Sequence, residues 1–99
     1  MTDTPSDIAR SVLAVESAAL TRLAQELPGD FDAVVSRLLT LPGRVIVSGM
    51  GKSGHVANKI AATLASTGTP AQAVHPGEAS HGDLGMITGK DAVILISNS

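Results

Sequence analysis

The chain has 99 residues, which suit one small domain, and its 43% hydrophobic content is sufficient for a globular core. Phe31 is the one aromatic residue and the net charge is −2, so the sequence offers neither a stacking platform nor a basic patch for nucleic acid. The absence of cysteine excludes disulfides and thiol chemistry. Without a signal-peptide pattern or an apolar run of membrane-spanning length, we expect a cytoplasmic protein with no membrane partner.

Two helices are expected before the first strand. Apolar residues recur at helical spacing from Ile8 to about Leu27, and Ser6 or Asp7 is a suitable cap for this helix. Residues 28–30 then end it and begin a second helix at Phe31, which reaches about residue 41 before a Pro-Gly pair. We therefore treat residues 1–43 as an N-terminal helical segment and residues 44–99 as the sheet-forming domain.

Strands and helices alternate through the second part of the chain. Short apolar runs predict strands at residues 44–48, 71–75 and 92–96, and Val56, Ile60 and Leu64 mark one face of a helix between the first two. Residues 76–90 are polar and are predicted to be a functional loop with a helical turn at 78–81. This alternation predicts an α/β fold with a parallel sheet, and ligands of such sheets bind at the carboxyl ends of the strands. Three polar segments are therefore expected to converge on one crevice.

A glycine-rich stretch, Gly49-Met50-Gly51-Lys52-Ser53-Gly54, lies between the first predicted strand and the third helix. Such a turn directs main-chain N–H groups and a helix dipole toward an anion. The stretch fits G-x-G-x-x-G, but His75-Pro76 occupies the place where a dinucleotide site has an acidic residue. A P-loop also requires a glycine at position 46, where this chain has isoleucine. A phosphate group is therefore favoured over a dinucleotide or ATP, and no cofactor is expected.

Several polar side chains near these strand ends are candidates for ligand binding. Ser53 suits either a phosphate or the cap of the third helix, and the spacing leaves both alternatives open. Lys52 is placed to meet an anion, although an exposed loop lysine is the ordinary alternative. Residues 97–99 are either a frayed terminus or a segment whose hydroxyl and amide side chains bind phosphate oxygens.

A weaker hypothesis concerns metal. His75, Glu78 and His81 are spaced three apart, so on a helix they would share one face, with Asp83 nearby. Pro76 disturbs that geometry and the set of ligands is small. Hydrogen-bonding roles are therefore favoured over a metal site.

Four stretches, residues 49–55, 61–70, 75–86 and 96–99, together resemble the sugar isomerase (SIS) domain of the arabinose-5-phosphate isomerase family. The resemblance is dense over residues 44–99 and extends to the N-terminal helices only by pattern. It implies a flavodoxin-like, five-stranded parallel sheet, of which this chain would hold the first three strands. It also implies interconversion of D-ribulose 5-phosphate and D-arabinose 5-phosphate, whose product feeds synthesis of the octulosonate sugar (Kdo) of lipopolysaccharide.

The resemblance also assigns roles to residues. It implies that Lys52 is catalytic. Binding of the substrate or its phosphate is implied for seven further residues: Gly51, Ser53, Gly54, His75, His81, Ser97 and Ser99. The family's groups for proton transfer lie beyond the third strand, so we expect an N-terminal fragment that is inactive alone and belongs to a homo-oligomer, a tetramer, at full length. The alternative is a non-catalytic, sugar-phosphate-sensing SIS module of a regulator, although no basic recognition helix precedes the sheet.

Overall fold

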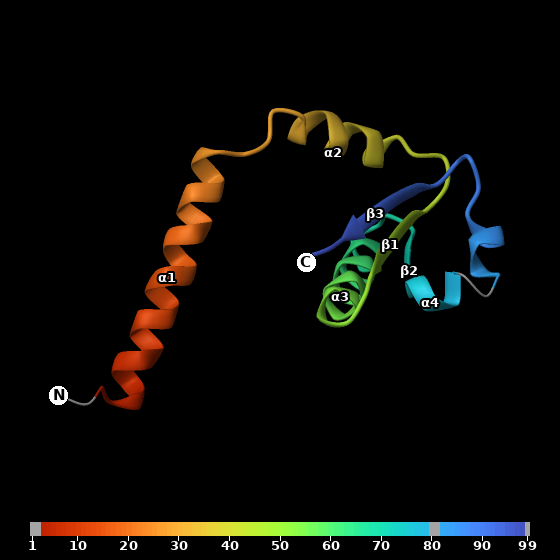
Figure 1. Cartoon of the computed structure of the whole chain (residues 1–99). Helices are drawn as coiled ribbons and strands as arrows, with labels where there is room; N and C mark the ends of the chain where they lie inside the picture. The colour runs from red at the N-terminus through yellow and green to blue at the C-terminus, as the bar shows by residue number, and fades with distance from the viewer. Residues whose placement is uncertain (1–2, 80–81, 99) are drawn as a thin grey trace. The chain divides into compact units, whose positions relative to one another are not determined.

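The computed structural model describes residues 3–79 and 82–98, and these fall into two compact units, one up to Asp32 and one from Ala33 onward (Figure 1). The first unit contains α1 (Pro5–Gln25), and α2 (Phe31–Leu39) begins at the boundary. The second unit continues with β1 (Val45–Gly49), α3 (Lys52–Ser66), β2 (Ala71–Ala73), α4 (Pro76–Ala79), the 3-10 helix η1 (Asp83–Met86) and β3 (Ala92–Ile96).

Helix α1 begins earlier than the sequence indicated, because Thr4 rather than Ser6 or Asp7 is its N-cap. The Thr4 hydroxyl accepts the Asp7 N–H, and the Asp7 carboxylate accepts the Thr4 N–H, each at 3.1 Å. This is a capping box, and the hydrogen bonds from Thr4 lower the pKa of Asp7. The helix contains no buried residue. Its large apolar side chains are about half to two-thirds exposed: Ile8, Val12, Leu13, Val15, Leu20 and Leu23.

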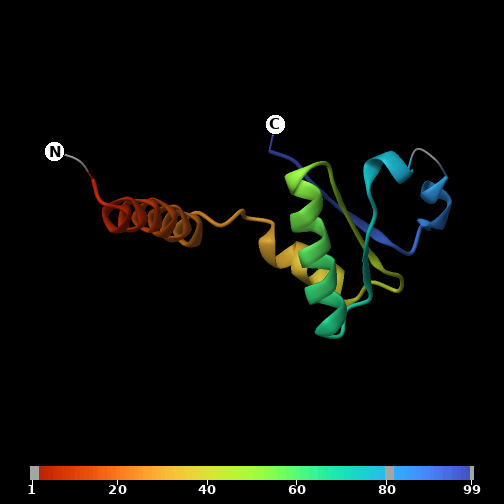
Figure 2. The same ribbon diagram turned by 90° about the horizontal axis from the view of Figure 1, so that it is seen from below.

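The second unit is built on a parallel three-stranded sheet in the order β2-β1-β3. Val45 of the central strand is in register with Ala71 of β2 and Ala92 of β3. All five residues of β1 are buried, which confirms the prediction of a strand covered on both faces. Helix α3 contacts all three strands and lies along one face of the sheet (Figure 2).

The core lies between the central strand and α3. Val45 and Val47 are fully buried and pack with Ala57 and Ala61, whose small side chains allow the helix to approach the sheet closely. Strand β3 is an outer strand of this sheet, and its side chains alternate. One set is half-buried, whereas Leu95 on the other face is 77% exposed.

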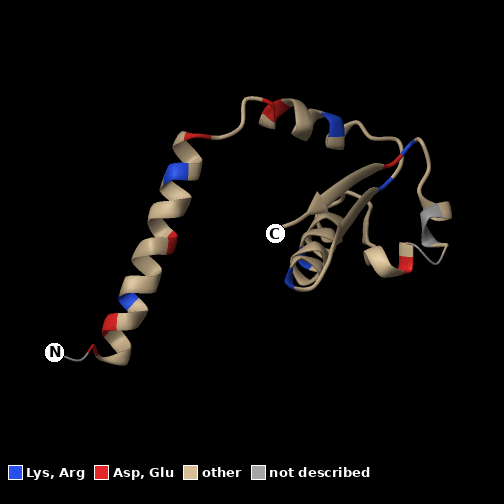
Figure 3. Ribbon diagram, in the orientation of Figure 1, with Lys and Arg blue, Asp and Glu red and all other residues tan. Residues whose placement is uncertain are grey.

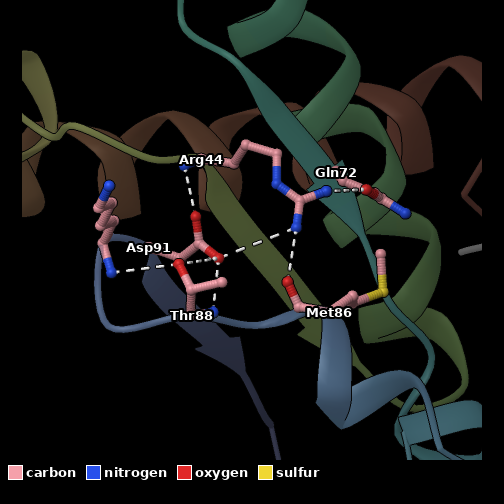
Figure 4. A network of polar contacts seen from close by, with 6 residues as sticks. Arg44, Gln72, Met86, Thr88 and Asp91 are labelled. Carbon is pink, nitrogen blue, oxygen red and sulfur yellow. Dashed lines mark hydrogen bonds and ion pairs between the residues drawn. The ribbon is translucent and has the colours of Figure 1, made fainter.

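Arg44 and Asp91 form the centre of a polar network where the strands begin, away from the glycine-rich turn (Figure 4). The Asp91 carboxylate accepts the main-chain N–H of Arg44 at 2.7 Å and that of Thr88 at 2.8 Å. The Arg44 guanidinium donates to the Gln72 side chain at 2.7 Å and to the Met86 carbonyl at 2.8 Å. These bonds join the start of β1 to both outer strands and to the end of the polar loop. The N–H groups of Arg44 and Thr88 hold the pKa of Asp91 below its usual value.

The polar loop contains more regular structure than the sequence indicated. The expected turn at 78–81 is observed as α4, which begins two residues earlier, while residues 80 and 81 lie outside the described part of the chain. The 3-10 helix η1 was not predicted. Among the described residues, no helix is long and apolar enough to cross a membrane. Charges alternate in sign along α1, so this helix presents no basic face (Figure 3).

Candidate functional site

The glycine-rich turn joins the buried strand β1 to α3 through two residues, Met50 and Gly51. Gly51 is the N-cap of α3 and has φ 58° and ψ −128°, a combination that side-chain-bearing residues rarely adopt. The N-cap is Gly51 and no described side chain caps the helix, so the alternative in which Ser53 is the cap is wrong. Among the described residues, the N–H groups of Gly51 and Lys52 have no hydrogen-bond acceptor. They are available to an anion at the N-terminus of α3.

The other two glycines of the turn are required by close packing. A Cβ on Gly54 would lie 2.8 Å from the Gly49 carbonyl oxygen, and a Cβ on Gly49 would lie 2.8 Å from the Ser53 carbonyl. The first turn of α3 therefore touches the end of β1 directly. The G-x-G-x-x-G spacing therefore has two causes. Gly51 is required by its backbone conformation, and Gly49 and Gly54 are required because a side chain would not fit between β1 and α3.

A cavity of about 510 Å³ opens at the carboxyl ends of β1 and β3, and we call it the β1–β3 cavity. Its lining comes from the turn, from the ends of both strands and from the start of α4: Ser48, Gly49, Met50, Lys52, Ser53, Pro76, Leu95, Ile96, Ser97 and Asn98. The structure thus brings together Lys52, Ser53 and Ser97, as the sequence indicated. The apolar wall formed by Met50 and Leu95 was not predicted.

The β1–β3 cavity has the chemistry of an anion site. Lys52 is exposed and makes no ion pair with any described residue, and the Ser53 hydroxyl is half-buried without a hydrogen-bond partner among them. No carboxylate or imidazole is among the lining residues that the structure describes. One ammonium group, two serine hydroxyls and the open N–H groups of the turn can together surround phosphate oxygens.

A second cavity of about 230 Å³ lies between β2 and α3, and we call it the β2–α3 cavity. Its lining residues are Gly49, Gly54, Ala57, Asn58, Ala73, Val74, His75 and Glu78. The three polar segments do converge on the β1–β3 cavity, the second of them through Pro76, but Gly54 and His75 line the β2–α3 cavity instead. The Ser48 hydroxyl donates to the Val74 carbonyl and ties the ends of β1 and β2 together between the two cavities.

Gly51 is not among the described lining residues of either cavity, and it contributes through its conformation and its open main-chain N–H. His81 and Ser99, two further residues expected in the site, lie outside the described residues. His75 and Glu78 share the β2–α3 cavity, but within residues 3–79 and 82–98 no three His, Asp or Glu side chains gather to hold a metal ion. The sequence analysis did not identify Asn58 as a cavity residue. Its position four residues after Gly54 could have indicated this, because residues four apart lie on the same face of a helix.

A parallel sheet with a glycine-rich strand-to-helix turn at its carboxyl edge defines an α/β domain of the phosphate-binding kind. Residues 38–99 match the family model described as the SIS domain, and the chain belongs to this family. Helices and a three-stranded parallel sheet of this kind are also found in its structural neighbours, which confirms the predicted fold class.

The chain is 57% identical over 90 residues to arabinose 5-phosphate isomerase KdsD of Yersinia pestis, covering 91% of this chain and 27% of that protein. It is also 57% identical over 91 residues to arabinose 5-phosphate isomerase KpsF of Escherichia coli O6:H1, covering 91% of this chain and 28% of the relative. A solved structure, c3406 of Escherichia coli CFT073 in complex with A5P, is 41% identical with a TM-score of 0.85, over 98% of this chain and 53% of its own. The chain thus spans less than a third of the curated relatives it matches.

Proposed function

We propose that the chain supplies the phosphate-binding part of a sugar-phosphate isomerase that interconverts D-arabinose 5-phosphate and D-ribulose 5-phosphate. The observation that carries this proposal is the β1–β3 cavity, where the Lys52 ammonium group and the Ser53 hydroxyl border one opening whose described lining has no carboxylate. The similarity to arabinose 5-phosphate isomerases and to a protein solved with A5P supports the choice of ligand. Placement in the pathway to the Kdo sugar of lipopolysaccharide is part of the same proposal.

In this proposal the phosphate is held from three sides. The N–H groups of Gly51 and Lys52 approach from the turn, the Ser53 hydroxyl from the first turn of α3, and Ser97 from the end of β3. Ser99, two residues further along, would add a hydroxyl from the same segment. Gly54 takes part by allowing α3 to start against β1.

The isomerisation moves a proton between C1 and C2 of the sugar, which requires a base, a group that polarises the carbonyl, and an anchor for the phosphate. In our proposal the described residues anchor the phosphate. Lys52, the catalytic residue that the resemblance implies, adds positive charge toward the carbon atoms that react. His81 belongs to this part of the proposal as an active-site histidine. Among the described residues no carboxylate or imidazole lines the β1–β3 cavity, and we propose that the 99-residue chain binds the substrate without converting it.

The same proposal includes a cytoplasmic location and a homo-oligomeric, tetrameric full-length protein. The exposed apolar side chains of α1, such as Leu20 at 68% and Leu23 at 53%, support an assembly in which this helix is covered. The alternative function is a non-catalytic module that senses a sugar phosphate. The observation in its favour is that the described lining of the β1–β3 cavity contains no carboxylate or imidazole base.

An assay on the full-length protein separates the two functions. Conversion of ribulose 5-phosphate to arabinose 5-phosphate, abolished or strongly reduced by Lys52→Ala, is the result expected for the isomerase. Tight binding of arabinose 5-phosphate without turnover would instead identify a sensing module. Failure to bind either sugar phosphate would contradict both functions.

A further inference from the structure

We propose that Ser48 is a positioning residue of the β1–β3 cavity. Its hydroxyl sets the point at which the chain leaves the β2 side of the sheet, and so sets where the polar loop meets the cavity. The inference rests on the proposed function, which assigns this cavity to a sugar phosphate. It adds a residue that acts through the Val74 carbonyl and not through contact with the ligand.

Ser48 is a buried polar residue, with only 8% of its surface exposed. Its hydroxyl donates to the Val74 carbonyl at 2.5 Å, and Val74 is itself 6% exposed. A buried carbonyl that loses its donor is costly to leave unpaired. A hydroxyl carries one proton, so Ser48 has none left to donate to a phosphate, although it lines the cavity. Its contribution to the site therefore comes through Val74.

The bond lies at the point where β1 and β2 stop pairing. Val47 and Ala73 are the last residues in register, and Ser48 would pair next with Val74. The Val74 N–H still donates to the Val47 carbonyl at 2.9 Å, as in a continued parallel ladder. A continued ladder would also join the Gly49 N–H to the Val74 carbonyl, and this bond is not formed in the described chain. The Ser48 hydroxyl takes its place.

The departure from β1 is confined to the β2 side. On the other side, β1 stays paired with β3 as far as Gly49 and Ile96. Val47 packs against α3, and side chains alternate along a strand, so Ser48 projects from the opposite face of the sheet. Its hydroxyl draws the Val74 carbonyl toward that face and out of line with the ladder.

The polar loop begins immediately after this bond. The His75 carbonyl accepts the N–H groups of Glu78 and Ala79, both at 3.0 Å, which starts α4. Pro76, the first residue of α4, lines the β1–β3 cavity together with Ser48. The direction in which the chain leaves the sheet therefore determines where this wall of the cavity stands.

The far end of the polar loop has its own connections to the sheet. The Arg44 guanidinium donates to the Met86 carbonyl at 2.8 Å, and the Asp91 carboxylate accepts the Thr88 N–H, also at 2.8 Å. These bonds do not involve Ser48. Loss of its hydroxyl should therefore loosen the near end of the loop alone, which separates a positioning role from a general loss of stability.

Hydrogen exchange and kinetics of the full-length protein test this inference together. In Ser48→Ala, amide exchange in residues 74–79 should rise by about tenfold, the effect of losing one buried hydrogen bond, while exchange in residues 45–47 and 88–91 stays within about twofold. The value of kcat/KM for ribulose 5-phosphate should fall by about tenfold, because a wall of the site is displaced. Inhibition by inorganic phosphate should stay within about twofold, since the groups that hold phosphate are unchanged.

Two further variants complete the experiment. Ser48→Thr, which keeps the hydroxyl, should restore both the slow exchange and the rate. Thr67→Val is the matched control, because the Thr67 hydroxyl also donates to a main-chain carbonyl, that of Thr63 at 2.7 Å, but at the other end of α3. It should change neither measurement.

Unchanged exchange in residues 74–79 of Ser48→Ala would overturn the inference, because the hydroxyl would then not hold the loop. Faster exchange with unchanged kcat/KM would make Ser48 structural only. An equal loss of turnover and of inhibition by phosphate would make it a direct ligand, and failure of Ser48→Thr to restore either quantity would show that the hydroxyl is not the cause. Absence of turnover in the unaltered full-length protein would contradict the proposed function, while the exchange result would still decide whether Ser48 holds the loop.

Discussion

A Cβ atom on Gly54 would lie 2.8 Å from the carbonyl oxygen of Gly49, closer than side-chain carbons approach backbone oxygens in proteins. The end of the central strand and the first turn of α3 are therefore in a contact that only glycine permits. This contact places the N-terminus of α3, with Lys52 and Ser53, at the edge of the β1–β3 cavity.

Gly54→Ala should destabilise the fold by about 1 to 3 kcal/mol, because an added methyl group in a closely packed contact forces the backbone to shift. Chemical denaturation measures the change. Gly29→Ala is the matched control, since no heavy atom lies within 4 Å of its added Cβ. Equal stabilities of the two variants would show that the turn relaxes without cost and that this contact does not position the helix.

Acid should weaken the fold partly through Asp91. Its side chain is 3% exposed, and the N–H groups of Arg44 and Thr88 lower its pKa in the folded state. The unfolded chain therefore binds a proton more readily, and the stabilisation is fully present above the unfolded-state pKa of about 3.9. It is lost as pH falls through the lower folded-state pKa. Denaturation curves recorded between neutral pH and about pH 3 should show this loss, together with a contribution from Asp7.

Asp91→Asn should flatten this acid dependence. It should also lower stability at neutral pH, because the variant has no charged hydrogen-bond acceptor at this position. Asp30→Asn is the control, because Asp30 is exposed and makes no hydrogen bond or ion pair with any described residue. An unchanged pH profile in Asp91→Asn would mean that the network of Figure 4 does not couple folding to protonation.

Helix α1 should take part in self-association. Leu23 lies on its apolar side, whereas Ala14, nine residues earlier, lies on the opposite side of a helix with 3.6 residues per turn. Leu23→Glu should lower the mass measured by light scattering after size-exclusion chromatography, and Ala14→Glu, which adds the same charge, should leave it unchanged. Equal masses for both variants and the unchanged chain would exclude α1 from the interface.

Lys52 should matter for turnover and not for folding. It is exposed and makes no ion pair with any described residue, so its removal leaves the core intact. In the full-length protein, Lys52→Ala should reduce the isomerase rate while the thermal midpoint stays close to that of the unchanged protein. Lys59→Ala, seven residues along α3, should affect neither quantity. A parallel fall of rate and midpoint in Lys52→Ala would assign this residue a structural role.

The sequence predicted the sheet well because the patterns that indicate strands and turns each lie within a short stretch of the chain. The apolar run from Val45 and the run from Ala92 were each found as strands, and the glycine pattern located the turn. The separation into two cavities was not predictable, since it depends on which face of α3 meets β2 and brings Asn58 beside His75. The network around Asp91 was likewise missed, because it joins residues 47 positions apart in the chain.

The most direct test of the account is the affinity of the chain for arabinose 5-phosphate when single hydroxyls of the β1–β3 cavity are removed. Ser53→Ala and Ser97→Ala should each weaken binding by roughly 1 to 2 kcal/mol in a calorimetric titration, because each removes a hydrogen bond to a charged phosphate. Ser17→Ala on α1 should leave the affinity unchanged. Unchanged affinity in both cavity variants would contradict the assignment of this cavity to the phosphate.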